Sequence, residues 1–147
     1  MIIEHDAENA GPLFLYVAFQ APHWPVQQKP GFAERNSHIA GRQRRKWCGL
    51  ISGLDDGVAE IVAALKAKDM YDNSVILAFS DNGGDIRTGA SNHPYRGDKM
   101  TPWEGGTSAL LGVEFFVGGV VGVGVGVGVG VGVEGGGVKG GRVKGGV

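Results

Sequence analysis

The end of the sequence, residues 117–147, is built almost entirely from glycine and valine. It alternates valine with glycine and then runs into glycine stretches broken by a few charged residues. Such a segment buries too little apolar surface to offset the chain entropy of glycine, so we expect it to be disordered. Alternating valine also suits a strand and is similar to elastin repeats, but no turn signal or partner face accompanies it. A folded core must therefore come from residues 1–116.

The first part of the chain has the pattern of a strand, a helix and a second strand. An uninterrupted apolar run covers residues 12–19, which is typical of a strand buried on both faces. Apolar residues then recur at helical spacing over residues 44–68, which predicts a helix with one face inward. A second buried strand is predicted at residues 74–80. This order predicts an α/β fold whose helix makes a right-handed crossover between parallel strands.

Three glycines interrupt the predicted helix at four-residue intervals, at positions 49, 53 and 57. Glycine costs about 1 kcal/mol relative to alanine in a helix interior, so these positions weaken the helix. We interpret them as points where the sheet approaches the helix closely. Cys48 lies beside Trp47 on the inward face and is predicted to belong to the core.

Charge and hydropathy argue against several classes of function. The formal net charge is -1 and the sequence pI is about 6.4, so no basic field attracts nucleic acid or an anionic membrane. The basic cluster at residues 42–46 lacks interleaved aromatic residues and is predicted to be a solvated face. No apolar stretch is long enough to span a bilayer, and the first residues lack the basic and apolar regions of a signal peptide. The single cysteine cannot form an internal disulfide or a multi-thiolate zinc site.

Polar residues follow both predicted strands. Open α/β sheets bind ligands at the carboxyl ends of parallel strands, so these strand ends are where a site is expected. Asp81 and Asn82 follow the second strand and precede two glycines, which let the backbone turn sharply. A carboxylate beside an amide oxygen suits a hard divalent cation such as calcium or magnesium. Asp-Asn-Gly is also a common turn sequence, and these residues taken alone favour a turn over a metal site.

Candidate anion-binding residues lie in two loops. His23 follows the first strand and stands between two prolines, which stiffen the loop around it. A histidine held in this way can donate a proton or bind an anion, or it can serve only to hold the loop together. Residues 92–106 mix charged, aromatic and glycine residues in a long connection of the kind that lines sites. Within it, Lys99 is a point charge suited to a tetrahedral anion, whereas Arg96 suits a bidentate or structural pairing.

Four segments of the sequence carry a resemblance to a known family. They are Leu-Phe-Leu-Tyr-Val-Ala-Phe-Gln-Ala-Pro-His, Gly-Leu-Ile-Ser-Gly-Leu-Asp-Asp-Gly-Val, Ser-Asp-Asn-Gly-Gly, and Arg-Gly-Asp-Lys followed by Trp-Glu-Gly-Gly. In this order they resemble the type I sulfatases of the alkaline-phosphatase-like superfamily, in particular arylsulfatase B. The resemblance implies a partial sulfatase catalytic domain over residues 1–116, with buried parallel strands and a crossover helix. It also implies a sulfuric ester hydrolase, lysosomal or secreted, that acts on aryl sulfate esters or sulfated carbohydrates.

The resemblance assigns roles to four residues. Asp81 and Asn82 match two ligands of the active-site calcium of the family. His23 matches a histidine that contacts the sulfate group near the leaving oxygen, and Lys99 matches a lysine that binds sulfate. The physical properties agree, because a cation and a lysine neutralise charge on sulfuryl oxygens and a histidine can assist departure of the alkoxide.

Other parts of the active site of the family have no counterpart in this sequence. The family nucleophile is a formylglycine made from the cysteine of a Cys-x-Pro-x-Arg motif, whereas Cys48 is followed by Gly-Leu-Ile-Ser. The paired aspartates that complete the metal site are missing as well. We therefore expect this chain to bind calcium weakly and not to hydrolyse sulfate esters by itself. Two other interpretations stay open: a metal-dependent phosphodiesterase of the same superfamily, and a non-catalytic binding or structural protein.

Overall fold

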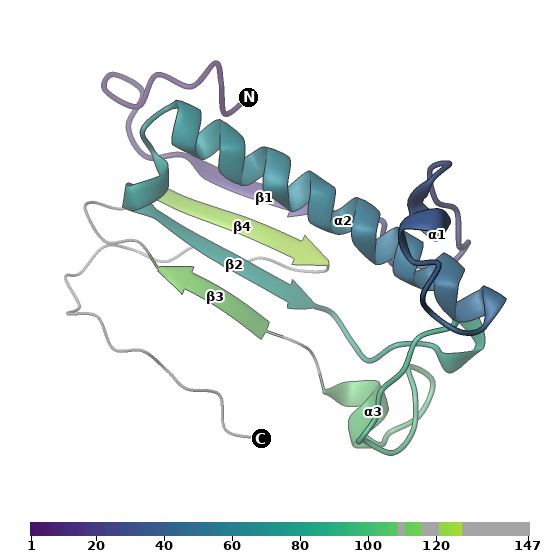
Figure 1. Cartoon of the computed structure of the whole chain (residues 1–147). Coiled ribbons are helices and arrows are strands. Elements are labelled where there is room, and N and C mark those ends of the chain that lie inside the picture. Colours follow the sequence, from purple (N-terminus) through teal and green to yellow (C-terminus); the bar gives the residue numbers. More distant parts are fainter. Residues whose placement is uncertain (109–110, 116–120, 128–147) are drawn as a thin grey trace.

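A mixed sheet with a long helix along one face forms the described part of the protein, residues 1–108, 111–115 and 121–127 of the computed structural model. Figure 1 shows the helix, α2, lying along the strands, with its axis in roughly the same direction as theirs. The main elements are β1 (Phe14–Ala18), α2 (Arg42–Ala67), β2 (Ser74–Ser80), β3 (Leu111–Phe115) and β4 (Val121–Val127). The short helical segments are α1 (Phe32–Arg35), η1 (Tyr71–Asn73), η2 (Ile86–Thr88) and α3 (Glu104–Thr107).

The sheet has the strand order β1-β4-β2-β3. β4 pairs in parallel with β1 and with β2, so β1 and β2 run in the same direction, as the predicted crossover requires. The register places Val123 beside Leu15 on one side and Ile76 on the other. β3, which the sequence pattern did not reveal, pairs with β2 in the antiparallel direction. The long helix and both predicted strands are confirmed, within a sheet that is mixed rather than purely parallel.

β4 departs from the expectation that residues 117–147 are disordered. It lies between β1 and β2, so the two predicted strands are neighbours of β4 and not of each other. The physical reason is that β1 and β2 present backbone N–H and C=O groups that need partners, and an extended Val-Gly segment can supply them. The rest of the segment predicted to be disordered, residues 117–120 and 128–147, lies outside the described residues.

The hydrophobic core lies between α2 and one face of the sheet. Leu65 of α2 is fully buried, and Leu15 of β1 is only 6% exposed. The neighbours of Leu15 on the strand, Phe14 and Tyr16, are 57% and 42% exposed, because successive side chains of a strand point to opposite faces. The described residues therefore bury one face of β1, and the prediction of burial on both faces is wrong for this strand.

The glycines of α2 serve close packing, but not against the sheet strands as predicted. A Cβ at Gly49 would overlap the side chain of Gln28, and a Cβ at Gly57 would lie 2.9 Å from Cε1 of Phe19. Both neighbours belong to the segment that follows β1. The glycines therefore let this segment, which carries His23, lie directly on α2.

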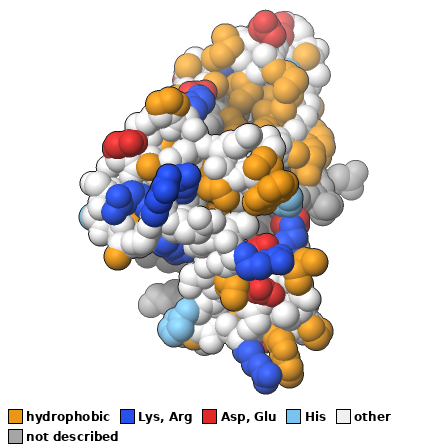
Figure 2. Space-filling model, turned by 90° about the vertical axis from the view of Figure 1, so that its right-hand side faces the viewer, with side chains coloured by type: hydrophobic (Ala, Val, Ile, Leu, Met, Phe, Trp, Pro, Cys, Tyr) orange, Lys and Arg blue, Asp and Glu red, His pale blue; other side chains and the backbone are white. Residues whose placement is uncertain are grey.

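The basic cluster at residues 42–46 is more than the predicted solvated face. Arg44 donates from Nη1 to the carbonyl of Gly89 at 2.7 Å, and its guanidinium lies 4.9 Å from the ring centroid of Trp47. Arg45 donates from Nε and Nη2 to the carbonyl of Ile39 at 3.2 and 3.1 Å. These contacts fasten the start of α2 to neighbouring loops. Figure 2 shows basic side chains interspersed with acidic ones on the face it presents, so no continuous basic surface forms there.

α1 is held to α2 by an ion pair. Arg35 donates from Nη1 to Oδ2 of Asp56 at 2.6 Å and from Nη2 to Oδ1 at 3.1 Å. The two side chains are 51% and 45% exposed, so solvent screening keeps the stabilisation small. The hydrogen bonds from Arg35 hold the pKa of the Asp56 carboxyl below its usual value of 3.8.

We expect Asp56→Asn to destabilise the fold slightly at neutral pH and to remove part of its acid sensitivity. A carboxyl whose pKa is lowered by folding stabilises the fold above its unfolded pKa, and this contribution is lost as the pH falls through the folded pKa. The free energies of unfolding of wild type and variant, measured with urea, should therefore differ near neutral pH, begin to converge below about pH 3.8 and become equal only below the lowered pKa of Asp56. The matched control, Asp55→Asn, removes the neighbouring exposed carboxylate, which acts on Arg35 only through its charge, and should change stability much less than Asp56→Asn. A difference that persisted unchanged in acid would contradict this account.

Candidate functional site

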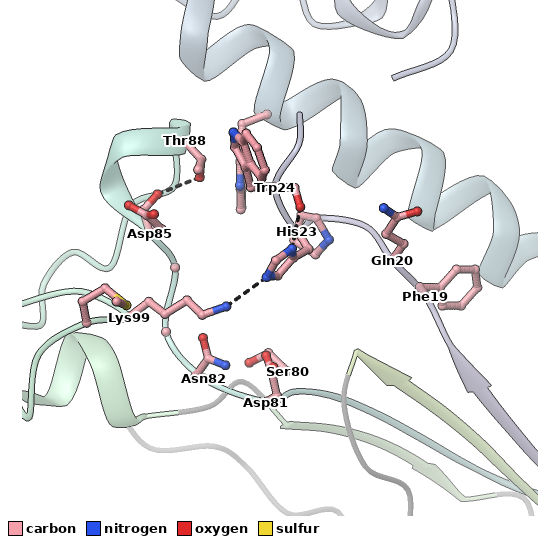
Figure 3. Close-up of a pocket in the computed structure, with 15 residues that line it drawn as sticks. Phe19, Gln20, His23, Trp24, Ser80, Asp81, Asn82, Asp85, Thr88 and Lys99 are labelled. Carbon is pink, nitrogen blue, oxygen red and sulfur yellow. Dashed lines mark hydrogen bonds between the residues drawn. The ribbon is translucent and has the colours of Figure 1, made fainter. Parts of the chain in front are cut away.

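A pocket lies at the edge of the sheet where β1 and β2 end. Both strands run parallel to β4, so their carboxyl ends reach the same edge. The loops that leave them, together with Trp47 of α2 and Lys99, line an open pocket of about 500 Å³. Figure 3 shows that all four residues predicted from the sequence line it, with Asp81 and Asn82 on the β2 side of the pair formed by His23 and Lys99.

His23 and Lys99 are in direct contact within the pocket. Lys99 Nζ lies 3.2 Å from His23 Nε2, and His23 Nδ1 lies 2.6 Å from the carbonyl oxygen of Trp24. A carbonyl only accepts hydrogen bonds, so Nδ1 is assigned the proton and Nε2 accepts from the Lys99 ammonium. These two hydrogen bonds orient the imidazole ring and direct the ammonium group into the pocket (Figure 3).

Asp81 and Asn82 present oxygen atoms directly after β2. Asp81 is exposed and Asn82 is half-buried. Within the residues that the structure describes, no group of three or more His, Cys, Asp or Glu side chains is placed to hold a metal ion. The pair therefore presents one carboxylate and one amide oxygen at this edge, and the described residues place no such cluster around them.

Glycines bring the loop after β2 against α3 with backbone touching backbone. The N–H of Gly83 donates to the carbonyl of Gly106 at 3.0 Å. A Cβ on Gly83 would overlap a carbonyl oxygen of α3, and a Cβ on Gly106 would overlap the carbonyl oxygens of Asp98 and Thr101. Only residues without a side chain allow this approach, which places the turn around Lys99 beside the end of β2.

Sequence reasoning missed several residues of the pocket, above all Asp85 and Trp24. Arg87 donates from Nε and Nη2 to the Asp85 carboxylate at 2.9 and 2.8 Å, and these hydrogen bonds hold the pKa of Asp85 below its usual value. The positive charge of Lys99 acts in the same direction. The only sequence signals for these two residues were that Trp24 follows His23 and that Asp85 follows the glycines after Asn82. The further lining residues are Phe19, Gln20, Pro22, Trp47, Ser80, Gly83, Gly84, Thr88 and Met100.

Comparison with known proteins identifies the family. A family model described as Sulfatase matches residues 1–109. This chain belongs to the sulfatase family. The sulfatase chain is 44% identical over 110 residues to arylsulfatase J of Mus musculus, a match that covers 75% of this chain and 18% of that protein. It is 32% identical over 108 residues to N-acetylgalactosamine-6-sulfatase of Sus scrofa, covering 71% of this chain and 20% of that protein.

A solved structure shares the fold of this sulfatase chain. The protein described as "Crystal structure of Ps i-CgsB in complex with k-i-k-neocarrahexaose" superposes with a TM-score of 0.70 at 34% identity, over 77% of this chain and 25% of that chain. The chain thus spans about a fifth of the length of the curated relatives named above, 18% and 20%. In the described part of the chain, no helix has both the length and the apolar character needed to cross a bilayer.

Proposed function

We propose that this chain carries part of the substrate site of a sulfuric ester hydrolase, an arylsulfatase of the N-acetylgalactosamine-4-sulfatase type. The convergence of His23, Lys99, Asp81 and Asn82 on one pocket carries the proposal. An ammonium group beside an imidazole, next to carboxylate and amide oxygens, can hold a tetrahedral anion and a cation together. The proposed substrates of the intact protein are sulfated carbohydrates and aryl sulfate esters. In support, one relative is an N-acetylgalactosamine-6-sulfatase and the similar solved structure contains k-i-k-neocarrahexaose.

Lys99 and His23 have separate tasks in this proposal. The ammonium of Lys99 neutralises charge on the sulfuryl oxygens, where negative charge is concentrated. Nε2 of His23 accepts from Lys99 in the structure. In the intact protein, once a sulfate ester draws the lysine to its oxygens, Nε2 can take a proton from water and donate it to the ester oxygen as the bond between that oxygen and sulfur breaks. The carbonyl of Trp24 holds Nδ1–H and so keeps the ring in the required orientation.

Asp81 and Asn82 fit the oxygen chemistry of calcium, but they supply only part of a shell of about six to eight ligands. They would hold one side of the ion, which when bound neutralises charge on the sulfate oxygens. Because the described residues place no cluster of acidic or histidine side chains there, we expect weak calcium binding by this chain.

Formylglycine does not fit the residues present. Cys48 is half-buried on α2, is absent from the pocket lining, and lacks the proline and arginine of the family motif. A nucleophile must reach the sulfur atom inside the pocket, which this thiol does not. The proposal therefore gives this chain a binding role and no turnover by itself.

Apolar side chains give the pocket a surface for the organic part of the ester. Trp24 and Met100 are 69% and 73% exposed although both are large and apolar. An exposed indole offers a flat face to a sugar or aryl ring. We assign the ring of the substrate to this surface, since the cavity of about 500 Å³ is larger than a sulfate group requires.

Organisation and location complete the proposal. Residues 1–116 are proposed as a partial catalytic domain, followed by a low-complexity segment at residues 117–147. β4 lies within residues 117–147 of the sequence, but it pairs with β1 and β2 and so is part of the sheet formed by residues 1–116. A lysosomal or secreted location of the intact protein is proposed from the family resemblance.

Isothermal titration of sulfate into the chain tests the proposal. We expect weak, saturable binding that strengthens when calcium is present, because the ion adds a positive charge beside Lys99. Asp81→Ala should abolish the effect of calcium and should not weaken sulfate binding without calcium, whereas Asp72→Ala, outside the pocket, should change neither. No sulfate binding, or tighter binding of phosphate, would contradict the proposal and favour the other interpretations. A chromogenic sulfate ester should not be turned over even after coexpression with a formylglycine-generating enzyme.

A further inference from the structure

The side-chain amide of Asn92 joins the two loops that carry the proposed ligands. Its Oδ1 accepts from the N–H of Gly84 at 2.8 Å, and its Nδ2 donates to the carbonyl of Gly84 at 2.8 Å. The same Nδ2 donates to the carbonyl of Gly97 at 3.2 Å. Gly84 ends the turn that begins at Asp81, and Gly97 stands shortly before Lys99. One side chain thus ties the loop after β2, which carries Asp81 and Asn82, to the loop that carries Lys99, which we call the lysine loop.

Asn92 itself does not line the pocket and is half-buried. The two loops also meet through the backbone, because Lys99 N–H donates to the Gly84 carbonyl at 3.3 Å, and both loops pack on α3, where Gly83 N–H donates to the Gly106 carbonyl at 3.0 Å. Asn92 adds a side-chain link that joins the two loops directly. An amide group is the one uncharged side-chain group that offers an acceptor and two donors at once, which is what these backbone atoms require. Aspartate keeps the acceptor alone, and alanine keeps neither.

We propose that Asn92 is a positioning residue that sets the distance between Lys99 and the Asp81–Asn82 pair. The inference deepens the proposed function and rests on it for its effect on sulfate binding, but not for its effect on loop geometry. Without the amide, the lysine loop loses its side-chain tie to the end of β2 and keeps only the backbone contacts. Lys99 then no longer stays within hydrogen-bond distance of His23, and an anion meets one positive group fewer.

A matched pair of variants tests this role. Asn36, which does not line the pocket, makes comparable hydrogen bonds from Nδ2 to the carbonyl of Phe32 and to Oγ of Ser52, both at 2.9 Å. Asn92→Ala should abolish the nuclear Overhauser effect between the His23 ring and the Lys99 side chain, and it should speed hydrogen exchange of the Gly84 amide. Asn36→Ala should do neither, although both variants lower the melting temperature. Sulfate affinity should fall roughly tenfold in Asn92→Ala only.

The readouts separate the inference from the proposed function. Retention of the His23–Lys99 contact in Asn92→Ala overturns the inference, whether or not sulfate binds. Absence of sulfate binding in the wild type contradicts the proposed function, and the contact measurement still decides the role of Asn92. If Asn92→Ala does not fold, Asn92→Asp serves instead. It should protect the Gly84 amide through its acceptor and still lose the His23–Lys99 contact, and a retained contact in that variant overturns the inference.

Discussion

Replacing Gly106 by alanine is expected to lower the free energy of unfolding by about 3 kcal/mol, at the upper end of the usual cost of overpacking. The added Cβ would overlap the carbonyl oxygens of Asp98 and Thr101, and backbone atoms cannot rotate away as a side chain can. Either α3 or the turn from Asp98 to Thr101 must move. Because Lys99 lies in that turn, its contact with His23 at 3.2 Å should be lost as well.

Urea unfolding and the His23–Lys99 nuclear Overhauser effect measure the two consequences. The matched control is Gly53→Ala in α2, where the nearest heavy atom to the added Cβ is Cε1 of Phe32 at 3.7 Å, an ordinary contact. Alanine has a higher helix propensity than glycine, so Gly53→Ala should raise the free energy of unfolding by about 1 kcal/mol. The same substitution thus has opposite signs at the two glycines. Wild-type stability in Gly106→Ala would show that α3 and the lysine turn are not packed as described.

The parts of the fold that the sequence predicts are those set by local patterns. The apolar run at Ser74–Ser80 became β2 with unchanged bounds, and the helical spacing around Leu65 gave α2. β4 could not be predicted, because alternating valine and glycine lack a hydrophobic pattern that selects one partner. Its place depends on the unpaired edges that β1 and β2 present, which is a property of the assembled sheet.

In the site, too, some residues could be predicted from local sequence patterns, whereas others depend on how the folded elements pack together. The shared location of His23, Asp81 and Asn82 was predictable because parallel strands bring their carboxyl ends to one edge, whereas the roles proposed for them rest on the family resemblance. Lys99 was singled out from the chemistry of its loop together with the same resemblance. Asn92 was not, since its partners are backbone atoms of Gly84 and Gly97. Almost every residue type has the same backbone N–H and C=O groups, so the sequence does not indicate which of them Asn92 will contact. A residue whose proposed role is to position other side chains is therefore harder to find from sequence than a charged residue proposed to contact the ligand.

Lys99→Met is expected to weaken sulfate binding by about tenfold to a hundredfold, the equivalent of the roughly 1.5–3 kcal/mol that a hydrogen bond to a charged group contributes. Methionine has a similar unbranched shape, so the packing of the aliphatic stem is largely kept while the charge is removed. Nε2 of His23 also loses its donor, at 3.2 Å in the wild type, and is left to water or to the ligand. Stability should change little, because Lys99 is only half-buried.

Titration calorimetry with sulfate at two ionic strengths separates this effect from a general change of charge. Lys68→Met, at the C-cap of α2 and outside the pocket lining, removes the same charge from a residue that does not face the anion. That control should shift affinity slightly at low salt and not at all at high salt, since long-range fields are screened beyond about 10 Å at 0.1 M. The loss in Lys99→Met should persist at high salt, because a direct contact leaves no room for screening ions. Equal losses in the two variants would mean that sulfate responds to net charge alone, and the pocket would then not be its binding site.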